Sequence, residues 1–198
     1  MKILCLGDSY TIGEGVPFPL NYPHQIASAL ASENYTIEEL TIVATTGWTT
    51  DELIGPMEMQ IKKNHYDWVT ILIGVNNQYR GRSAAEYEVH FAYLLNRAIY
   101  FAQGNAQQVI VLSIPDWGMT PFNTERNKVE VSAAIDEYNA INKKLALQAN
   151  VNYIDITPST RTNATNAEFL AIDGLHPSGK EYEVWAKECV KVMQANGL

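Results

Sequence analysis

Residues 2–15 read Lys-Ile-Leu-Cys-Leu-Gly-Asp-Ser-Tyr-Thr-Ile-Gly-Glu-Gly, a short apolar run that ends abruptly in small and polar residues. The run from Lys2 to Leu6 has the length and composition of a buried β-strand that ends at a turn. Gly7 permits the backbone to turn where a side chain would clash. Ser9 is then carried past the strand end, into the region where open α/β sheets bind ligands. A serine in this place is a candidate nucleophile, provided that the chain supplies a base and an oxyanion site elsewhere.

Five apolar segments alternate with segments of helical periodicity along the chain. We expect strands at 2–6, 35–43, 68–73, 109–114 and 152–156, and helices near 23–30, from 50, at 84–101, at 131–145 and after 178. Loops are expected at 17–21, 78–83, 115–127 and up to about 172. Such alternation predicts a three-layer α/β/α sandwich around a five-stranded parallel sheet, in the flavodoxin-like order 2-1-3-4-5.

Two helix starts carry recognisable signals. Asn21 lies near the cap of one helix, with Pro23 at its first helical position. Ser178, followed three residues later by Glu181, has the pattern of a capping box for the last helix.

Composition limits the class of protein. The 198 residues suit a single domain, 1–198, and a content of 46% hydrophobic and 18% charged residues indicates a folded globular chain. The net charge of −8 contains no basic run, so no nucleic-acid partner is expected. No apolar run reaches the length of a membrane span, and the chain enters a strand at residue 2 without a secretory signal. These features predict a cytoplasmic enzyme, and they leave its oligomeric state open.

The metal-binding and redox-active residue types are few and scattered. Cys5 and Cys189 have neither metal nor redox spacing, and we interpret both as small buried hydrophobic residues. His24, His65 and His90 are dispersed and have the character of ordinary surface or core histidines. The sequence therefore predicts no metal site and no cofactor.

Three consecutive predicted strands are followed by small polar clusters. Ser9, Gly47 and Asn76 follow the first, second and third strands, and the ends of parallel strands meet at one edge of a sheet. Asp173 and His176, three residues apart before the last helix, can supply an acid and a base for serine chemistry. The backbone N–H groups of Ser9 and Gly47, with the side-chain amide of Asn76, can act as oxyanion donors.

These clusters, in this order, resemble the four blocks of the SGNH (GDSL-type) hydrolase superfamily. The first block is matched by Gly7 to Tyr10, with Tyr10 where leucine is common, and the second by Gly47. The third is matched by Gly74 to Asn77, with Asn77 in place of the usual aspartate, and the last by Asp173-x-x-His176-Pro177. The resemblance covers nearly the whole chain. It implies that Ser9 attacks the ester, that His176 is general base and then acid, that Asp173 orients the imidazole, and that Ser9, Gly47 and Asn76 form the oxyanion hole.

Several residues have competing interpretations. Ser9 alone could be a helix N-cap, and Asn76 a turn residue. Ser113, at the end of the fourth strand, is the rival nucleophile, but it lacks a glycine-permitted turn, and we interpret it as structural. Asp116 and Asp155 are rival orienting acids; Asp173 is preferred because it lies only one turn from the histidine.

The substrate pocket is predicted from side chains on the loops at the site edge. We expect aromatic residues there to line an acyl or sugar pocket. Arg80 and Arg82 are interpreted as solvated loop charges, with a role in holding an anionic or sugar substrate as the alternative. The predicted pocket residues are Asp8, Trp48, Asn77, Tyr79, Trp117, Met119 and Phe122.

The leading hypothesis is therefore a serine carboxylester hydrolase with a small-molecule ester substrate. Candidate substrates are an acetylated sugar, a short acyl ester, a lysophospholipid and a thioester. A second hypothesis is a flavodoxin-like module that binds a flavin or nucleotide in the glycine-containing loop from Gly7 to Gly15, although this loop lacks the usual phosphate-binding patterns. A third is an inactive scaffold that binds a partner.

Overall fold

The computed structural model describes residues 1–62 and 65–198, and its centre is one parallel β-sheet. The strand order β2-β1-β3-β4-β5 confirms the predicted topology. Gly7 at the end of β1 pairs with Ala44 on one side and Leu72 on the other, so three adjacent strands end at the same edge. The strands are β1 (Lys2–Gly7), β2 (Glu39–Ala44), β3 (Trp68–Leu72), β4 (Val109–Leu112) and β5 (Asn152–Ile154).

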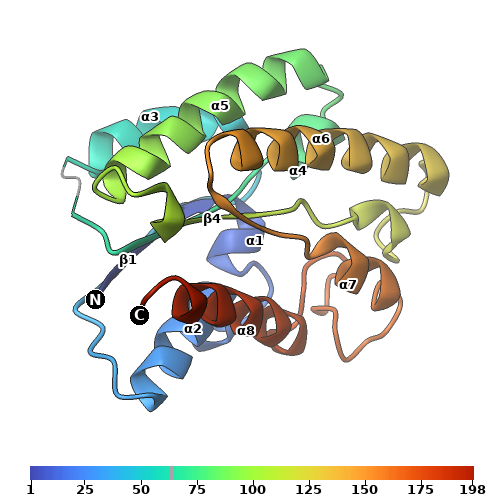
Figure 1. Cartoon of the computed structure of the whole chain (residues 1–198). Helices are drawn as coiled ribbons and strands as arrows, with labels where there is room; N and C mark the ends of the chain where they lie inside the picture. Colours follow the sequence, from blue (N-terminus) through green and yellow to red (C-terminus); the bar gives the residue numbers. More distant parts are fainter. Residues whose placement is uncertain (63–64) are drawn as a thin grey trace.

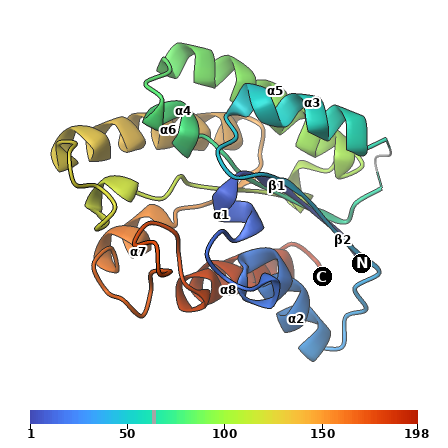
Figure 2. The ribbon, with the colours of Figure 1, turned by 180° about the vertical axis from the view of Figure 1, so that it is seen from behind.

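Helices cover both faces of the sheet, as predicted for an α/β/α sandwich (Figure 1). On one face α5 (Ala84–Phe101) packs between α3 (Thr50–Gln60) and α6 (Lys128–Gln148). On the other face α2 (Tyr22–Ser32) packs against α8 (Gly179–Ala195), as the view from behind also shows (Figure 2). The shorter segments are α1 (Ser9–Ile12), α4 (Val75–Tyr79), α7 (Thr157–Thr162), η1 (Phe18–Leu20), η2 (Ala106–Gln108) and η3 (Trp117–Met119).

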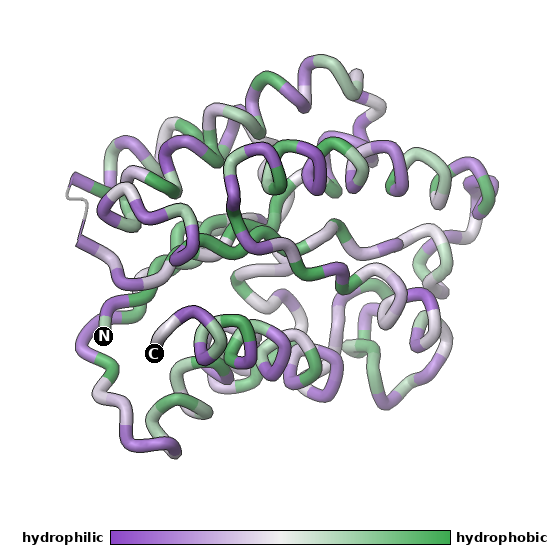
Figure 3. The backbone as a smooth tube through the Cα atoms, in the orientation of Figure 1, coloured by the Kyte–Doolittle hydropathy of each residue, from purple (hydrophilic) through white to green (hydrophobic). Residues whose placement is uncertain are grey.

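The core lies between the sheet and its two helix layers. Hydrophobic residues concentrate along the strands in the middle of the molecule (Figure 3), and every residue of β3 is buried. A sheet covered on both faces needs such continuous apolar strands. Cys5 and Cys189 are free and buried, and burial raises the pKa of the Cys5 thiol to about 12, so both act as small hydrophobic residues, as predicted. Among the residues that the structure describes, no helix combines the length and apolar character that crossing a bilayer requires.

The boundaries differ from the sequence prediction where a neighbouring segment decides them. Strand β2 begins at Glu39 rather than Tyr35, because β1 begins at Lys2, the residue that pairs with Glu39. Two predicted loops are partly helical: α4 extends to Tyr79, and α7 occupies 157–162. Pro158 in the first turn of α7 fits there because the first N–H groups of a helix have no internal partner.

The capping predictions are half correct. Asn21 caps α2 by accepting the N–H of His24 at 2.9 Å, although Pro23 is the second helical residue. Ser178 caps α8 through the N–H of Lys180. The predicted capping box is wrong, because the buried Glu181 carboxylate instead accepts from Trp185 Nε1 at 2.9 Å and from Asn163, the residue that follows α7, at 2.8 Å.

Candidate active site

Ser9 is the first residue of α1, directly after the turn that ends β1. The turn requires glycine at position 7, because a Cβ atom there would lie 2.0 Å from Thr11 Oγ1 and 2.4 Å from the carbonyl oxygen of Leu72. The chain thus leaves the sheet without a side chain in the way. Ser9 is placed at the amino end of a short helix, with its side chain on a pocket at the strand ends.

Asp173 and His176 lie on the loop before α8 and are joined by a hydrogen bond. The distance from His176 Nδ1 to Asp173 Oδ2 is 2.6 Å. The other carboxylate oxygen accepts the backbone N–H groups of Leu175 at 2.9 Å and of His176 at 3.0 Å. Although burial alone would raise it, these bonds hold the pKa of Asp173 below its ordinary value. The carboxylate therefore remains charged and fixes the ring, leaving Nε2 as the nitrogen that can accept a proton.

Gly47 lies in the turn after β2, in a left-handed conformation with φ of +87° that favours glycine. Arg80 Nη2 donates to its carbonyl oxygen at 2.6 Å. The same guanidinium pairs with Glu52, whose carboxylate also accepts the backbone N–H of Thr49 at 2.9 Å. Arg80 is a solvent-exposed loop charge, as predicted, and it also ties the Gly47 turn to the start of α3. Arg82, predicted to be solvated as well, pairs with a glutamate of α5.

Asn76 lies in the first turn of α4, immediately after β3. Its side-chain amide donates to the carbonyl oxygen of Trp48 at 3.0 Å and, at a longer 3.5 Å, to Asp8 Oδ2. The fully buried Asp8 also accepts the backbone N–H of Tyr10 at 3.0 Å. Burial raises the pKa of Asp8 to about 7, although these hydrogen bonds lower it. The amide is thus held at the pocket wall by groups from two neighbouring strand ends.

A pocket of about 190 Å³ brings together four of the five predicted catalytic and oxyanion-hole residues. Ser9, Gly47, Asn76 and His176 all line it, and Asp173 stands behind the histidine. In the described part of the chain no hydrogen bond joins Ser9 to His176, although both face this pocket. Catalytic hydrogen bonds are often long in unliganded enzymes and shorten when substrate binds.

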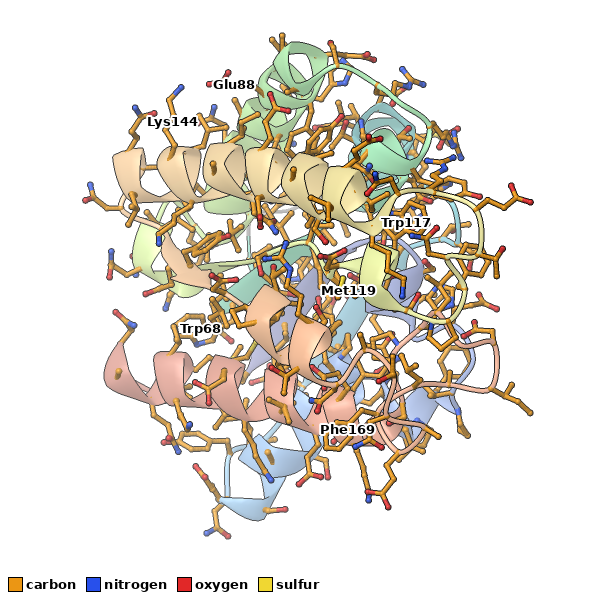
Figure 4. The ribbon with its side chains drawn as sticks, turned by 90° about the vertical axis from the view of Figure 1, so that its right-hand side faces the viewer. Trp68, Glu88, Trp117, Met119, Lys144 and Phe169 are labelled. Atoms are coloured by element: carbon orange, nitrogen blue, oxygen red, sulfur yellow. The ribbon has the colours of Figure 1, made fainter. Side chains whose placement is uncertain are left out.

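The predicted substrate-pocket residues divide into two groups. Tyr79, Trp117 and Phe122 line the pocket. Figure 4 shows Trp117 and Met119 on the connection that follows β4. Asp8, Trp48, Asn77 and Met119 do not line this pocket.

Each of the excluded residues near the strand ends has a structural partner instead. Asp8 is fully buried and accepts a long hydrogen bond from the Asn76 amide, and Trp48 contributes a backbone carbonyl to the same amide. Asn77 is buried and forms two hydrogen bonds with Thr50, which tie α4 to the first residue of α3.

The sequence prediction missed four residues that line the pocket. Tyr10, Thr46, Val75 and Leu175 are each adjacent in sequence to a predicted site residue, and Tyr10 also departs from the leucine that is common in the first block. The Tyr10 ring packs 5.1 Å from the His176 ring at a tilt of 52°. The tyrosine that replaces the more common leucine therefore contacts the imidazole directly.

The rival residues are engaged elsewhere. Ser113 Oγ is buried and accepts the N–H groups of Ile156 at 2.8 Å and Thr157 at 3.1 Å, a structural role as predicted. The Asp116 carboxylate pairs with Arg161 at 2.8 Å. Within the described residues no group of three or more His, Cys, Asp or Glu side chains is placed to hold a metal ion.

Comparisons with known proteins identify a family and several structures of similar fold. The model of the GDSL-like lipase/acylhydrolase family matches residues 5–184. Similar solved structures include TesA (TM-score 0.77, 15% identity, 99% of each chain covered) and Axe2, an acetylxylan esterase from Geobacillus stearothermophilus (0.76, 19%, 100% of this chain and 94% of that one). The esterase EstA from Pseudoalteromonas sp., in a structure inhibited by monoethylphosphonate, is also similar (0.70, 14%, 98% and 97%). A search of curated proteins found no match. At these identities the structural likeness establishes the fold.

Proposed function

Since the chain belongs to the GDSL-like lipase/acylhydrolase family and is a carboxylic ester hydrolase, we propose that Ser9, His176 and Asp173 carry out the hydrolysis within a single domain, 1–198. One observation carries the proposal: His176 is bonded to Asp173 at 2.6 Å and shares a pocket with Ser9. A serine, a base and an acid that orients the base are the elements of nucleophilic acyl transfer.

In the proposed mechanism the Ser9 oxygen attacks the ester carbonyl carbon while His176 Nε2 takes the hydroxyl proton. The carbonyl oxygen becomes an oxyanion that accepts hydrogen bonds from the N–H groups of Ser9 and Gly47 and from the Asn76 amide. The long 3.5 Å contact of this amide with Asp8 is the one most readily exchanged for the oxyanion. His176 then protonates the leaving alcohol, and a water molecule, deprotonated by the same imidazole, releases the acyl group from Ser9.

Small esters are the proposed substrates. A pocket of about 190 Å³ is smaller than the sites of roughly 300–1,000 Å³ that enclose drug-sized ligands, so it suits acetyl and other short acyl groups. An acetylated carbohydrate is one candidate, because Axe2, one of the similar structures, is an acetylxylan esterase. A lysophospholipid and a thioester are the alternatives.

Hydrolysis rates over p-nitrophenyl esters of increasing chain length, beside a panel of acetylated sugars, test this proposal. We expect activity to peak at short acyl chains and to disappear in Ser9→Ala. Ser32→Ala, on the outer side of α2, is the matched control and should retain full activity. Equal rates from acetate to long chains would contradict the small pocket, and comparable activity in Ser9→Ala would remove Ser9 from the mechanism.

A further inference from the structure

A second groove, of about 250 Å³, adjoins the pocket that contains Ser9. Both are lined by Tyr79, Trp117 and Phe122, so the same aromatic cluster forms the wall between them. Beyond this wall the groove is polar and is completed by residues 123–126. An ester whose reacting carbonyl lies at Ser9 can therefore extend its other half along the aromatic wall into a region of different chemical character.

Arg126 is held in this groove in a defined position. Its guanidinium lies 4.4 Å from the centre of the Tyr79 ring and 5.3 Å from that of Trp117. Nη1 donates to the carbonyl oxygen of Tyr79 at 2.8 Å. Asn123, which is buried, accepts the backbone N–H of Arg126 at 2.9 Å and donates to its carbonyl oxygen at 3.0 Å. Stacking and hydrogen bonding thus fix the cation before any ligand arrives.

Arg126 also differs from the other arginines in its charge environment. The other four arginines each pair with a carboxylate. In residues 1–62 and 65–198 Arg126 has no such partner, and no hydrogen bond is formed by its Nε or Nη2 groups. The pairs of the others are Arg80–Glu52, Arg82–Glu86, Arg97–Glu58 and Arg161–Asp116.

We propose that this groove binds the alcohol half of the ester and that Arg126 receives an anionic group on it, a carboxylate or a phosphate. The inference rests on the proposed hydrolase function. Two N–H directions of a fixed, unpaired guanidinium suit the oxygens of such a group. Glu125 also lines the groove and adds a negative charge to it, so the Arg126 guanidinium is the lining group that favours an anion there. A neutral alcohol gains nothing from this charge.

Three acetate esters of matched shape test the proposal: 4-acetoxybenzamide, 4-acetoxybenzoate and 4-acetoxyphenyl phosphate. In Arg126→Gln we expect kcat/KM to fall about tenfold for the two anionic esters and less than twofold for the amide. Arg126→Met, which keeps an apolar side chain over the rings, should give the same pattern. Added salt should weaken the anionic preference of the wild type. The anionic ester with the larger fall identifies the preferred anion.

Arg82→Gln, which removes an arginine that is paired with a carboxylate, is the control. Its kcat/KM should equal that of the wild type for all three esters. An equal loss for all three esters in Arg126→Gln would overturn the proposal, because the arginine would then only fasten the loop. Unchanged ratios would also overturn it. If the wild type hydrolyses none of the three esters, and Ser9→Ala has the same activity as the wild type on every ester tested, the proposed hydrolase function fails as well. If all three esters are hydrolysed and the wild-type and Arg126→Gln proteins have the same kcat/KM on each, only the anion subsite is refuted.

Discussion

Asp8→Asn probes the buried carboxyl that contacts the Asn76 amide. Burial raises the pKa of Asp8 from 3.8 to about 7 in the folded protein, whereas the unfolded chain returns it to its ordinary value. Between these two values the folded protein holds a proton that the unfolded chain has lost, so the free energy of unfolding falls as pH rises. At 1.36 kcal/mol per pH unit, a pKa raised from 3.8 to about 7 corresponds to about 4 kcal/mol in the free energy of unfolding. This contribution is completely lost only when the pH is above the pKa of Asp8 in the folded protein.

The variant keeps an acceptor oxygen for the Tyr10 N–H but cannot ionise. Urea unfolding near pH 5 and pH 8 measures the difference. From the lower to the higher pH, we expect the free energy of unfolding to fall by about 3 kcal/mol more in the wild type than in Asp8→Asn. All other titrating groups are common to both proteins, so their contributions cancel in the comparison. Parallel pH dependence in the two proteins would refute the reasoning.

Three further predictions concern steady-state kinetics on a short-chain ester. Asn76→Ala should lower kcat about 10²–10³-fold through loss of one oxyanion donor, and an unchanged kcat would show that the amide does not face the carbonyl. Arg80→Gln should lower kcat about tenfold with little change in KM, because the Gly47 turn loses its fastening, whereas Arg82→Gln should not; equal effects would exclude this positioning role. Tyr10→Leu should lower kcat threefold to tenfold while Tyr10→Phe does not, and identical losses would implicate the hydroxyl instead.

The strand ends were predictable because a parallel sheet imposes strong rules on the sequence. Buried strands require continuous apolar runs, and the first three runs here end in glycine or small polar residues. Gly7 could be recognised because a turn at that place excludes any side chain. In the structure, a Cβ atom at position 7 would lie too close to Thr11 Oγ1. The strand order was predicted by analogy with the flavodoxin-like doubly wound sheet, and the structure confirms it.

The pocket lining was less predictable, because neighbours in sequence point in different directions. Asn76 and Asn77 look alike as sequence, yet one faces the pocket and the other bonds Thr50 on α3. Which way each points depends on the helical turn that follows Gly74, and no pattern specified that turn. Glu181 matched a capping pattern, but Trp185 one turn later offered a buried N–H that needed its carboxylate. The orientation and the hydrogen-bond partners of these side chains depend on residues that are distant in sequence.

Covalent labelling most directly tests whether residues distant in sequence form one reactive site at Ser9. A fluorophosphonate reacts with an activated serine by forming an oxygen–phosphorus bond and releasing fluoride. Peptide mass spectrometry should find one label per chain, on the peptide that carries Ser9, with slow labelling in His176→Ala and none in Ser9→Ala. Labelling at another serine, or an equal rate in His176→Ala, would contradict the account.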